Sequence, residues 1–534
     1  MKKHTLLSTV IILMITNSAF AQLNWTKIWD YRYGGTAWDV PMAGIEAPGH
    51  GYLFAGKSLS DSSGNRVSPS SRVNFWHYWL VRVDSLGQKI WERNFGGTGD
   101  DFLASACTTP DGGFMIGGSS DSPISGDKSQ ASRGGLDYWV IKVDSTGHRQ
   151  WDKTFGGSLD DELRSIERTV DGGFILCGDS RSGISGDKTH ANYGVSDFWV
   201  VKINAQGVKQ WDWEFGGVNY ERAVKATQTA DKGYFICGQS ESPPSGNKTS
   251  ARRGFNDYWV LKTDSIGNIE WDKDYGGLLN DVMLTGIKTM DGGYIVGGHT
   301  NSSIGADKTD TLRGWEDYWI VKIDSQGIKQ WDKTFGTTTN EDEFSHIYQM
   351  SDHGYLFGVT SYSMLPNCDK SEPNMGIEQS WIIKTDSLGN KLWDKTAMTP
   401  GHDEATYIYP SFDKCYVLLG EDSGIPGGDN SSQAFDLLGD YWIVKYCPDE
   451  TSDITHLTAD AFNIYPNPFN DELHISWAID ARPCTVSLYD ILGKKISSQS
   501  MNESTVISTS KLARGVYVLD INVDGYRVTK KICK

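Results

Sequence analysis

The sequence predicts an all-β protein: a seven-bladed β-propeller of four-stranded blades, closed by its N-terminal strand and followed by a small C-terminal β-sandwich. Three observations lead to this fold class. Two tryptophan series each return seven times at intervals of 60 to 62 residues, each interval holds four strand-like runs, and helical spacing is absent. The 12% aromatic content and the 59 glycines suit pleated strands joined by tight turns.

The repeat is marked by a "WD" and a "DYW" motif. Their tryptophans are Trp29, Trp91, Trp151, Trp211, Trp271, Trp331 and Trp393, and Trp79, Trp139, Trp199, Trp259, Trp319, Trp381 and Trp442. Four antiparallel strands per repeat are typical of one propeller blade. Neighbouring positions on a strand face opposite sides, so Tyr138 and Trp139 each point toward a different adjacent blade. We therefore interpret both series as core between blades, with stacking on sugars as the alternative.

The phase of the repeat predicts how the ring closes. The chain opens with a lone fourth strand at 25–35, and the last repeat ends after a third strand at 440–447. The N-terminal strand can therefore complete the last blade and leave no free sheet edge. Cys415 and Cys447 fall near the start of one strand and the end of its antiparallel neighbour. This placement is compatible with a cross-strand disulfide and, as the alternative, with two free thiols.

Charged residues also repeat with the blades. We interpret Lys142 and Asp152, with their equivalents, as recurring ion pairs of the scaffold. The long loops between second and third strands repeat "SGDK" or a variant of it. Ordinary turn chemistry accounts for these loops, with calcium coordination as the alternative.

The end of the propeller that carries the long loops is the predicted ligand face. One position there is acidic in every repeat: Asp39, Asp101, Asp161, Glu221, Asp281, Glu341 and Asp403. A cation such as calcium could bridge these oxygens, which makes calcium the one candidate cofactor. In the alternative, each carboxylate accepts backbone N–H bonds and fixes its own loop. An asymmetric ligand would instead contact the irregular segments 61–77 and 361–378, or His402.

Catalytic and nucleic-acid-binding functions are not favoured. The chain has no G-x-S-x-G, H-E-x-x-H or C-x-x-C motif. Adjacent carboxylates such as Asp160 and Asp161 point to opposite faces of a strand and do not form a glycosidase pair. The formal net charge of -18 argues against a nucleic-acid partner. The sequence thus favours a protein without enzymatic activity.

The ends of the chain differ from the repeat region. Residues 1–21 have a basic start, an apolar stretch and an Ala19-Phe20-Ala21 end, which predicts a signal peptide. No second apolar run is long enough to span a membrane. The propeller is expected over 22–447, a polar linker over 448–460, and a separate β-sandwich over 461–534.

The motifs of this last segment resemble a known family. "YPNPF" at 465–469, "LYDILGKKI" at 488–496 and "LARGVYVLDINVDGYRVTKKICK" to Lys534 are similar to the type A C-terminal sorting domain of the type IX secretion system of Bacteroidota. The resemblance implies recognition by the type IX machinery, export across the outer membrane, removal of this domain, and release or anchoring through lipopolysaccharide. It implies recognition or folding roles for Pro466, Asn467, Pro468, Gly493, Gly515, Tyr517 and Lys530. The alternative is an adhesive β-sandwich.

The repeats at 25–447 resemble bacterial propeller repeats of the SBBP type through "FGG", "DGGF" and "G-x-S". Propellers serve many functions, so this resemblance names no ligand. We expect a secreted or outer-membrane-surface protein whose propeller binds a polysaccharide or a surface protein. One alternative is a polysaccharide hydrolase or lyase, favoured by an asymmetric cluster of carboxylates or histidines among the irregular loops. The other is a purely structural surface component.

Overall fold

The computed structural model describes residues 25–69, 74–339, 341–411, 413–435, 438–448, 462–477, 484–490, 494–502, 504–523 and 526–534. The chain divides into two compact units, Met1–Cys447 and Pro448–Lys534. The predicted signal peptide and all but the first residue of the predicted linker lie outside the described residues. Within the described residues, no helix has the length and apolar character needed to cross a membrane.

The described residues of the first unit form seven four-stranded antiparallel sheets, six of which consist of consecutive strands. The first sheet contains β2 (Asp39–Ala47), β3 (Gly51–Ser58), β4 (His77–Val83) and β5 (Lys89–Phe95). The second contains β6 (Asp101–Thr108), β7 (Phe114–Ser120), β8 (Asp137–Val143) and β9 (Arg149–Phe155). The third contains β10 (Asp161–Arg168), β11 (Phe174–Ser180), β12 (Asp197–Ile203) and β13 (Lys209–Phe215). The fourth sheet contains β14 (Glu221–Gln228), β15 (Tyr234–Ser240), β16 (Asp257–Thr263) and β17 (Ile269–Tyr275). The fifth contains β18 (Asp281–Lys288), β19 (Tyr294–Thr300), β20 (Asp317–Ile323) and β21 (Lys329–Phe335). The sixth contains β22 (Glu341–Gln349), β23 (Tyr355–Ser361), β24 (Gln379–Thr385) and β25 (Lys391–Thr396).

The last sheet combines both ends of this unit. Its order is β1 (Trp25–Tyr33), β28 (Asp440–Pro448), β27 (Tyr416–Asp422) and β26 (Asp403–Pro410). This is the pairing that the phase of the repeat predicts. Tyr33 and Tyr441 of this sheet share an apolar cluster with Trp79 of the first sheet.

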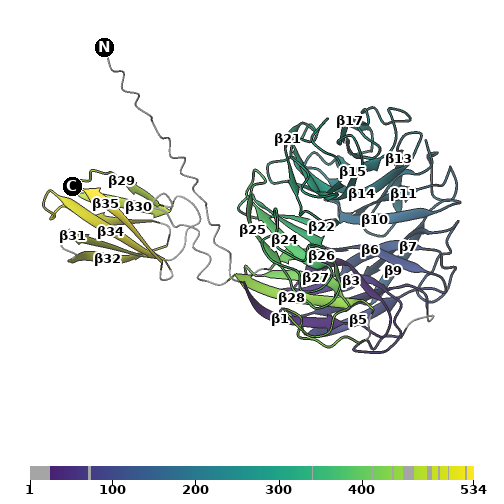
Figure 1. The fold of residues 1–534 in the computed structure, drawn as a ribbon, viewed down its shortest axis with the longest axis horizontal. Coiled ribbons are helices and arrows are strands. Elements are labelled where there is room, and N and C mark those ends of the chain that lie inside the picture. Colours follow the sequence, from purple (N-terminus) through teal and green to yellow (C-terminus); the bar gives the residue numbers. More distant parts are fainter. Residues whose placement is uncertain are drawn as a thin grey trace, which may run out of the picture. The chain divides into compact units, whose positions relative to one another are not determined.

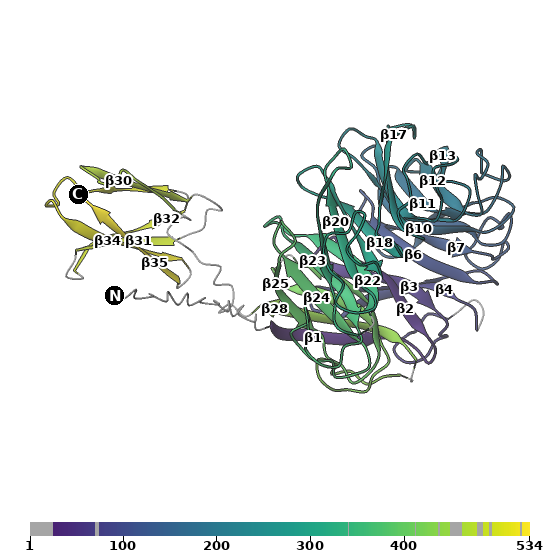
Figure 2. The same cartoon turned by 45° about the horizontal axis from the view of Figure 1, so that its top comes forward.

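The sheets are arranged as the blades of a β-propeller. In Figure 1 the first strands, among them β6, β10, β14, β22 and β26, lie near the middle, and fourth strands such as β13, β17, β21 and β25 lie toward the rim. The tilted view in Figure 2 shows the same order of sheets around the middle. Each blade thereby presents its first strand to a central channel.

Tryptophans of the DYW series form the core between blades, as predicted. All seven are fully buried. Tyr138 of one blade lies with its ring centroid 4.7 Å from that of Trp199 in the next, and its hydroxyl donates to the Trp199 carbonyl oxygen at 2.9 Å. The WD tryptophans are only half-buried, because they lie on the outermost strands.

The second unit contains two sheets around one core. The three-stranded sheet has the order β29 (Phe462–Tyr465), β30 (Glu472–Trp477), β33 (Ser504–Ser508), and the four-stranded sheet has the order β32 (Lys495–Met501), β31 (Cys484–Asp490), β34 (Val516–Val523), β35 (Tyr526–Cys533). Phe462 and Ile475 from the first sheet and Val486, Leu519 and Ile532 from the second belong to a single buried cluster.

Candidate binding site in the axial channel

The first strands of five blades contain an extra residue that interrupts their pairing with the second strands. These bulged residues are Met42, Ala104, Arg164, Val224 and Leu284. A β-bulge redirects side chains and is common beside functional sites. All five line a cavity of about 410 Å³ that is bounded by residues of β2, β6, β10, β14, β18, β22 and β26.

The residues that line this channel differ from blade to blade. At the position after the bulge, the lining residues are Ala43, Ser105, Ser165, Lys225, Thr285, His346 and Tyr407. The surrounding backbone and interblade core repeat, whereas these side chains do not. Sequence reasoning missed them, although the signal was present as variable positions within an otherwise constant repeat.

One wall of the channel, formed by β10 and β14, carries ion pairs. The Lys225 Nζ lies 2.9 Å from Glu167 Oε1, and Arg164 Nη2 lies 2.9 Å from Asp179 Oδ2 and 2.8 Å from Glu162 Oε2. Although burial lowers it, the pKa of Lys225 is raised overall by the Glu167 carboxylate. Arg164 and Lys225 are therefore held by carboxylates and stay charged.

Aromatic rings from β22 and β26 also line the cavity. These two strands lie across the middle from β10 and β14 in Figure 1. The His346 ring lies 4.8 Å from Tyr409 and 6.1 Å from Tyr407, measured between centroids. His346 Nδ1 donates to the Ile408 carbonyl oxygen at 3.0 Å, which leaves Nε2 as an acceptor. Burial, and then the charge of Lys225, lower the pKa of His346 to about 4, so the ring is neutral near pH 7.

The lining residues that the structure describes include one carboxylate and one thiol. Among the lining residues that the structure describes, Glu167 is the only carboxylate, and it is paired with Lys225. A glycosidase needs two carboxyl groups that flank the bond to be cleaved. Burial also raises the pKa of the Cys107 thiol to about 12, which leaves it protonated and a poor nucleophile.

The seven acidic residues predicted as a metal site begin the first strand of each blade. The six whose side chains are described are fully buried: Asp39, Asp101, Asp161, Glu221, Asp281 and Asp403. Of Glu341 the structure describes only the backbone.

Asp161 shows what these carboxylates contact. It accepts the Gly157 N–H at 2.6 Å and the Ser182 hydroxyl at 3.0 Å, and it also accepts from Ser180. These bonds join the interblade loop to the second strand, which favours the loop-fixing alternative. The described residues contain no group of three or more His, Cys, Asp or Glu side chains that could hold a metal ion.

A second buried carboxyl group lies beside several of these acids, at the start of the third strand of the preceding blade. Burial raises the pKa of Asp137 to about 7, and the nearby Asp161 carboxylate adds to this rise. In blade six the equivalent residue is Gln379, whose Nε2 donates to Asp403 Oδ2 at 2.9 Å. The Gln379 amide thus donates the hydrogen bond that a protonated Asp would donate at this position. This supports a proton shared between the two carboxyl groups at the equivalent place in the other blades.

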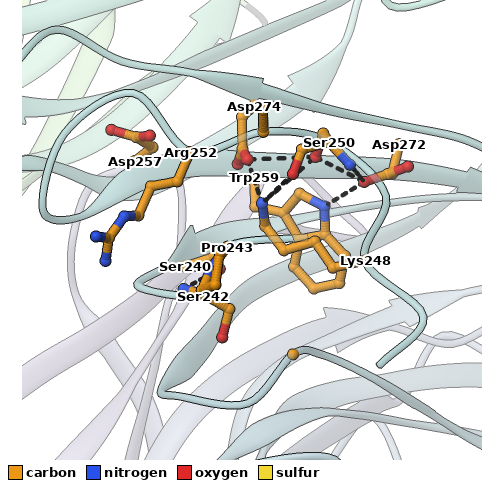
Figure 3. A network of polar contacts seen from close by, with 12 residues as sticks. Ser240, Ser242, Pro243, Lys248, Ser250, Arg252, Asp257, Trp259, Asp272 and Asp274 are labelled. Carbon is orange, nitrogen blue, oxygen red and sulfur yellow. Dashed lines mark hydrogen bonds and ion pairs between the residues drawn. The ribbon is translucent and has the colours of Figure 1, made fainter. Parts of the chain in front are cut away.

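The "SGDK" loops are explained by their lysines. In the fourth blade Lys248 is buried with its Nζ 5.8 Å from the centroid of the Trp259 ring and in an ion pair with Asp274 (Figure 3). The Trp259 indole N–H donates to Asp272 at 3.1 Å in the same network. The loop therefore folds back onto its own blade, which is a structural role.

The predicted pairing of Lys142 with Asp152 is wrong. Lys142 lies opposite Trp151 on the neighbouring strand, whereas Asp152 lies opposite Ile141, so the two side chains occupy opposite faces of the sheet. Lys142 instead forms an ion pair with Asp111 of the first turn. Asp152 accepts the Trp139 indole N–H at 3.1 Å.

The other candidate residues of this unit lie in the last two blades. A disulfide joins Cys415, directly before β27, to Cys447 in β28. Among the irregular segments, His402 contacts the buried Glu378. Residues 70–73 of the first-blade loop lie outside the described residues.

Several predicted sorting residues meet at the end of the chain. Asn467, between Pro466 and Pro468, accepts the Cys533 N–H on its side-chain oxygen at 3.0 Å. Gly515 exchanges backbone hydrogen bonds with Lys534 at 2.9 and 3.3 Å.

Two further residues that were predicted to act in sorting lie on the four-stranded sheet. The Tyr517 hydroxyl donates to the Ala513 carbonyl oxygen at 2.7 Å. Lys530 lies opposite Leu519 in the pairing of β34 with β35. Gly493, another residue of the predicted set, lies outside the described residues.

Comparison with known proteins decides the role of this second unit. Residues 463–534 match the family described as "Secretion system C-terminal sorting domain". The chain carries a type IX sorting domain. This implies that the protein is a cargo of the type IX secretion machinery and is secreted or displayed at the cell surface. No curated protein sequence matches the chain.

Solved structures resemble the chain at low sequence identity. YCF48 bound to D1 peptide is 9% identical, with a TM-score of 0.41 over 82% of this chain and 100% of its own. BBS1N in complex with ARL6DN is 8% identical, with a TM-score of 0.42 over 80% and 98%. Synechocystis apocarotenoid oxygenase is 10% identical, with a TM-score of 0.34 over 70% and 94%.

Proposed function

We propose that this type IX cargo is an extracellular binding protein and that its ligand, a polysaccharide or a surface protein, enters the axial channel. The scaffold is a closed seven-bladed propeller whose last blade includes the N-terminal strand. The disposition of β1 beside β28 and the apolar cluster shared by the last and first sheets support this closure. Residues 1–21 act as the signal peptide for the first export step.

One observation carries the assignment of the channel: its lining is asymmetric within a symmetric scaffold. Repeated side chains are explained by the packing of identical blades, because each blade must fit the same neighbour. The ion pairs on β10 and β14 and the aromatic rings on β22 and β26 have no such explanation. A cavity of about 410 Å³ with apolar and polar walls also has the size of small-molecule sites, about 300–1,000 Å³.

A thermal-melt screen of the full chain against soluble oligosaccharides and peptides tests this function. A ligand that binds only the folded state raises Tm. We expect the shift to be lost in Tyr407→Ala, which removes a channel ring, and kept in Tyr348→Ala, which removes an exposed ring of β22 outside the lining. A shift of equal size in both variants would place the ligand elsewhere.

The sorting domain directs the export of the protein. We propose that it is removed after translocation and that the propeller is then released or attached through lipopolysaccharide. The contacts of Asn467 and Gly515 with the last two residues support a role for the chain end in recognition.

A further inference from the structure

The charges and rings of the channel restrict which ligand it can hold. The cations Arg164 and Lys225 are matched by three carboxylates, those of Glu162, Asp179 and Glu167. Arg168 also lines the cavity and has no ion-pair partner among the described residues. The charges of Arg164 and Lys225 are thus matched by carboxylates, whereas Arg168 is exposed at the end of β10. A charged group buried beside Lys225 and Glu167 would meet charges that are already paired with each other, which is unfavourable.

The polar atoms of the channel can bind groups that both donate and accept hydrogen bonds. Lys225 supplies N–H donors, Glu167 supplies acceptor oxygens, and the neutral His346 ring has an acceptor at Nε2. Hydroxyl groups can donate to these acceptors and accept from the Lys225 N–H groups, and two or more of them are needed to bind all three residues. Tyr407 and Tyr409 offer ring surface on the facing wall, suited to a flat apolar face of the ligand.

We propose that the channel binds the uncharged end of a saccharide chain, with a sugar ring between the Tyr407 and Tyr409 wall and the Lys225–Glu167 pair. This inference rests on the proposed function and selects one ligand class within it. A sugar ring combines hydroxyl groups with apolar C–H faces and carries no charge. The end of a chain is expected because a cavity of about 410 Å³, lined by the first strands of all seven sheets, has the volume of a small-molecule site.

Binding of the full chain to a panel of oligosaccharides tests the inference. The panel contains neutral malto- and mannooligosaccharides, charged oligogalacturonides, and a library of random peptides. We expect at least one neutral saccharide to bind at least tenfold more tightly than any oligogalacturonide. Its affinity should change less than twofold between 0.05 and 0.5 M salt, because no ion pair is screened.

Two variants probe the ion pair directly. Glu167→Gln leaves the Lys225 charge uncompensated, so binding of the neutral saccharide should weaken at least fivefold and that of oligogalacturonides should strengthen. The matched control is Lys322→Met, which removes a comparable ion pair with Asp291 at 2.8 Å outside the channel lining. It should leave both affinities within twofold of wild type, and thermal melts of each variant verify that it is folded.

The outcomes separate this inference from the proposed function. Preferential binding of oligogalacturonides by the wild type, or a neutral saccharide unaffected by Glu167→Gln, would overturn the neutral-sugar assignment. Peptide binding that Tyr407→Ala abolishes would also overturn it, yet would keep the channel as the binding site. Binding of no member of the panel would overturn both.

Discussion

The hydroxyl of Tyr441 in the last blade donates a hydrogen bond to the carbonyl oxygen of Trp79 in the first blade, at 3.2 Å. Their rings lie 4.8 Å apart between centroids, and both residues are fully buried. Tyr78 makes the equivalent bond to Trp139 in the next blade at 3.0 Å. The contact between the last and the first sheet thus has the same chemistry as the contact between the first and the second.

Tyr441→Phe is expected to lower the free energy of unfolding by about 1 kcal/mol, the usual value of a buried neutral hydrogen bond. Tyr78→Phe should cost the same amount, because it removes the same bond between the first and second blades. Urea unfolding of the two variants measures both values. A closed ring would be contradicted if Tyr78→Phe lowers the free energy of unfolding by about 1 kcal/mol and Tyr441→Phe leaves it unchanged.

The Cys415–Cys447 disulfide should stabilise the last blade. It closes a loop with a sequence separation of 32 residues, and the chain-entropy relation gives about 3–4 kcal/mol for a loop of this length. We expect Cys415→Ser with Cys447→Ser to lower stability by this amount and to make unfolding independent of reductant. An unchanged melting temperature of the wild type in strong reductant would contradict this prediction.

The buried carboxyl groups at the blade junctions make stability depend on pH. An unfolded Asp has a pKa near 3.9, whereas folding raises that of Asp137 to about 7. The folded state therefore holds a proton that the unfolded state loses between these values. This contribution is complete below about pH 4 and disappears as the pH rises through 7.

Asp137→Asn and Gln379→Glu should have opposite effects on this pH dependence. Asn cannot ionise, so Asp137→Asn should raise the free energy of unfolding at pH 8 by on the order of 2–4 kcal/mol, since one pKa unit corresponds to about 1.36 kcal/mol. Gln379→Glu adds a buried carboxyl group beside Asp403 and should destabilise at pH 8 more than at pH 5. Urea unfolding at the two pH values is the measurement, and parallel pH profiles for all three proteins would refute a shared proton.

The repeat made the blades predictable, because the spacing of landmark residues such as Trp139 reports a periodic structure directly. The lining residue Arg164 was not predictable, because a bulge inserts one residue and reverses the expected face of the later residues in the strand without changing the composition. The partner of Lys142 was misassigned for a related reason: it depends on register across the hairpin, which the sequence does not specify.

Deletion of residues 461–534 should abolish appearance of the propeller outside the cell and cause it to accumulate in the periplasm, because the sorting domain is the signal for the last step of export. Immunoblots of periplasmic and extracellular fractions measure this. Normal extracellular amounts of the truncated protein would contradict the sorting role. Asn467→Ala, which removes the bond to the Cys533 N–H, should show a partial form of the same defect.

Occupation of the axial channel by the ligand is best tested by filling the channel. Ala104 lies at a bulge and lines the cavity, so Ala104→Phe reduces the space without altering any loop. Trp315, 81% exposed in a long loop, provides the comparison on the loop face. The affinity of a bound oligosaccharide or peptide should fall at least tenfold in Ala104→Phe and stay within twofold of wild type in Trp315→Ala. If Trp315→Ala loses binding while Ala104→Phe binds as tightly as wild type, the site lies on the loops, and this result would contradict an axial binding site.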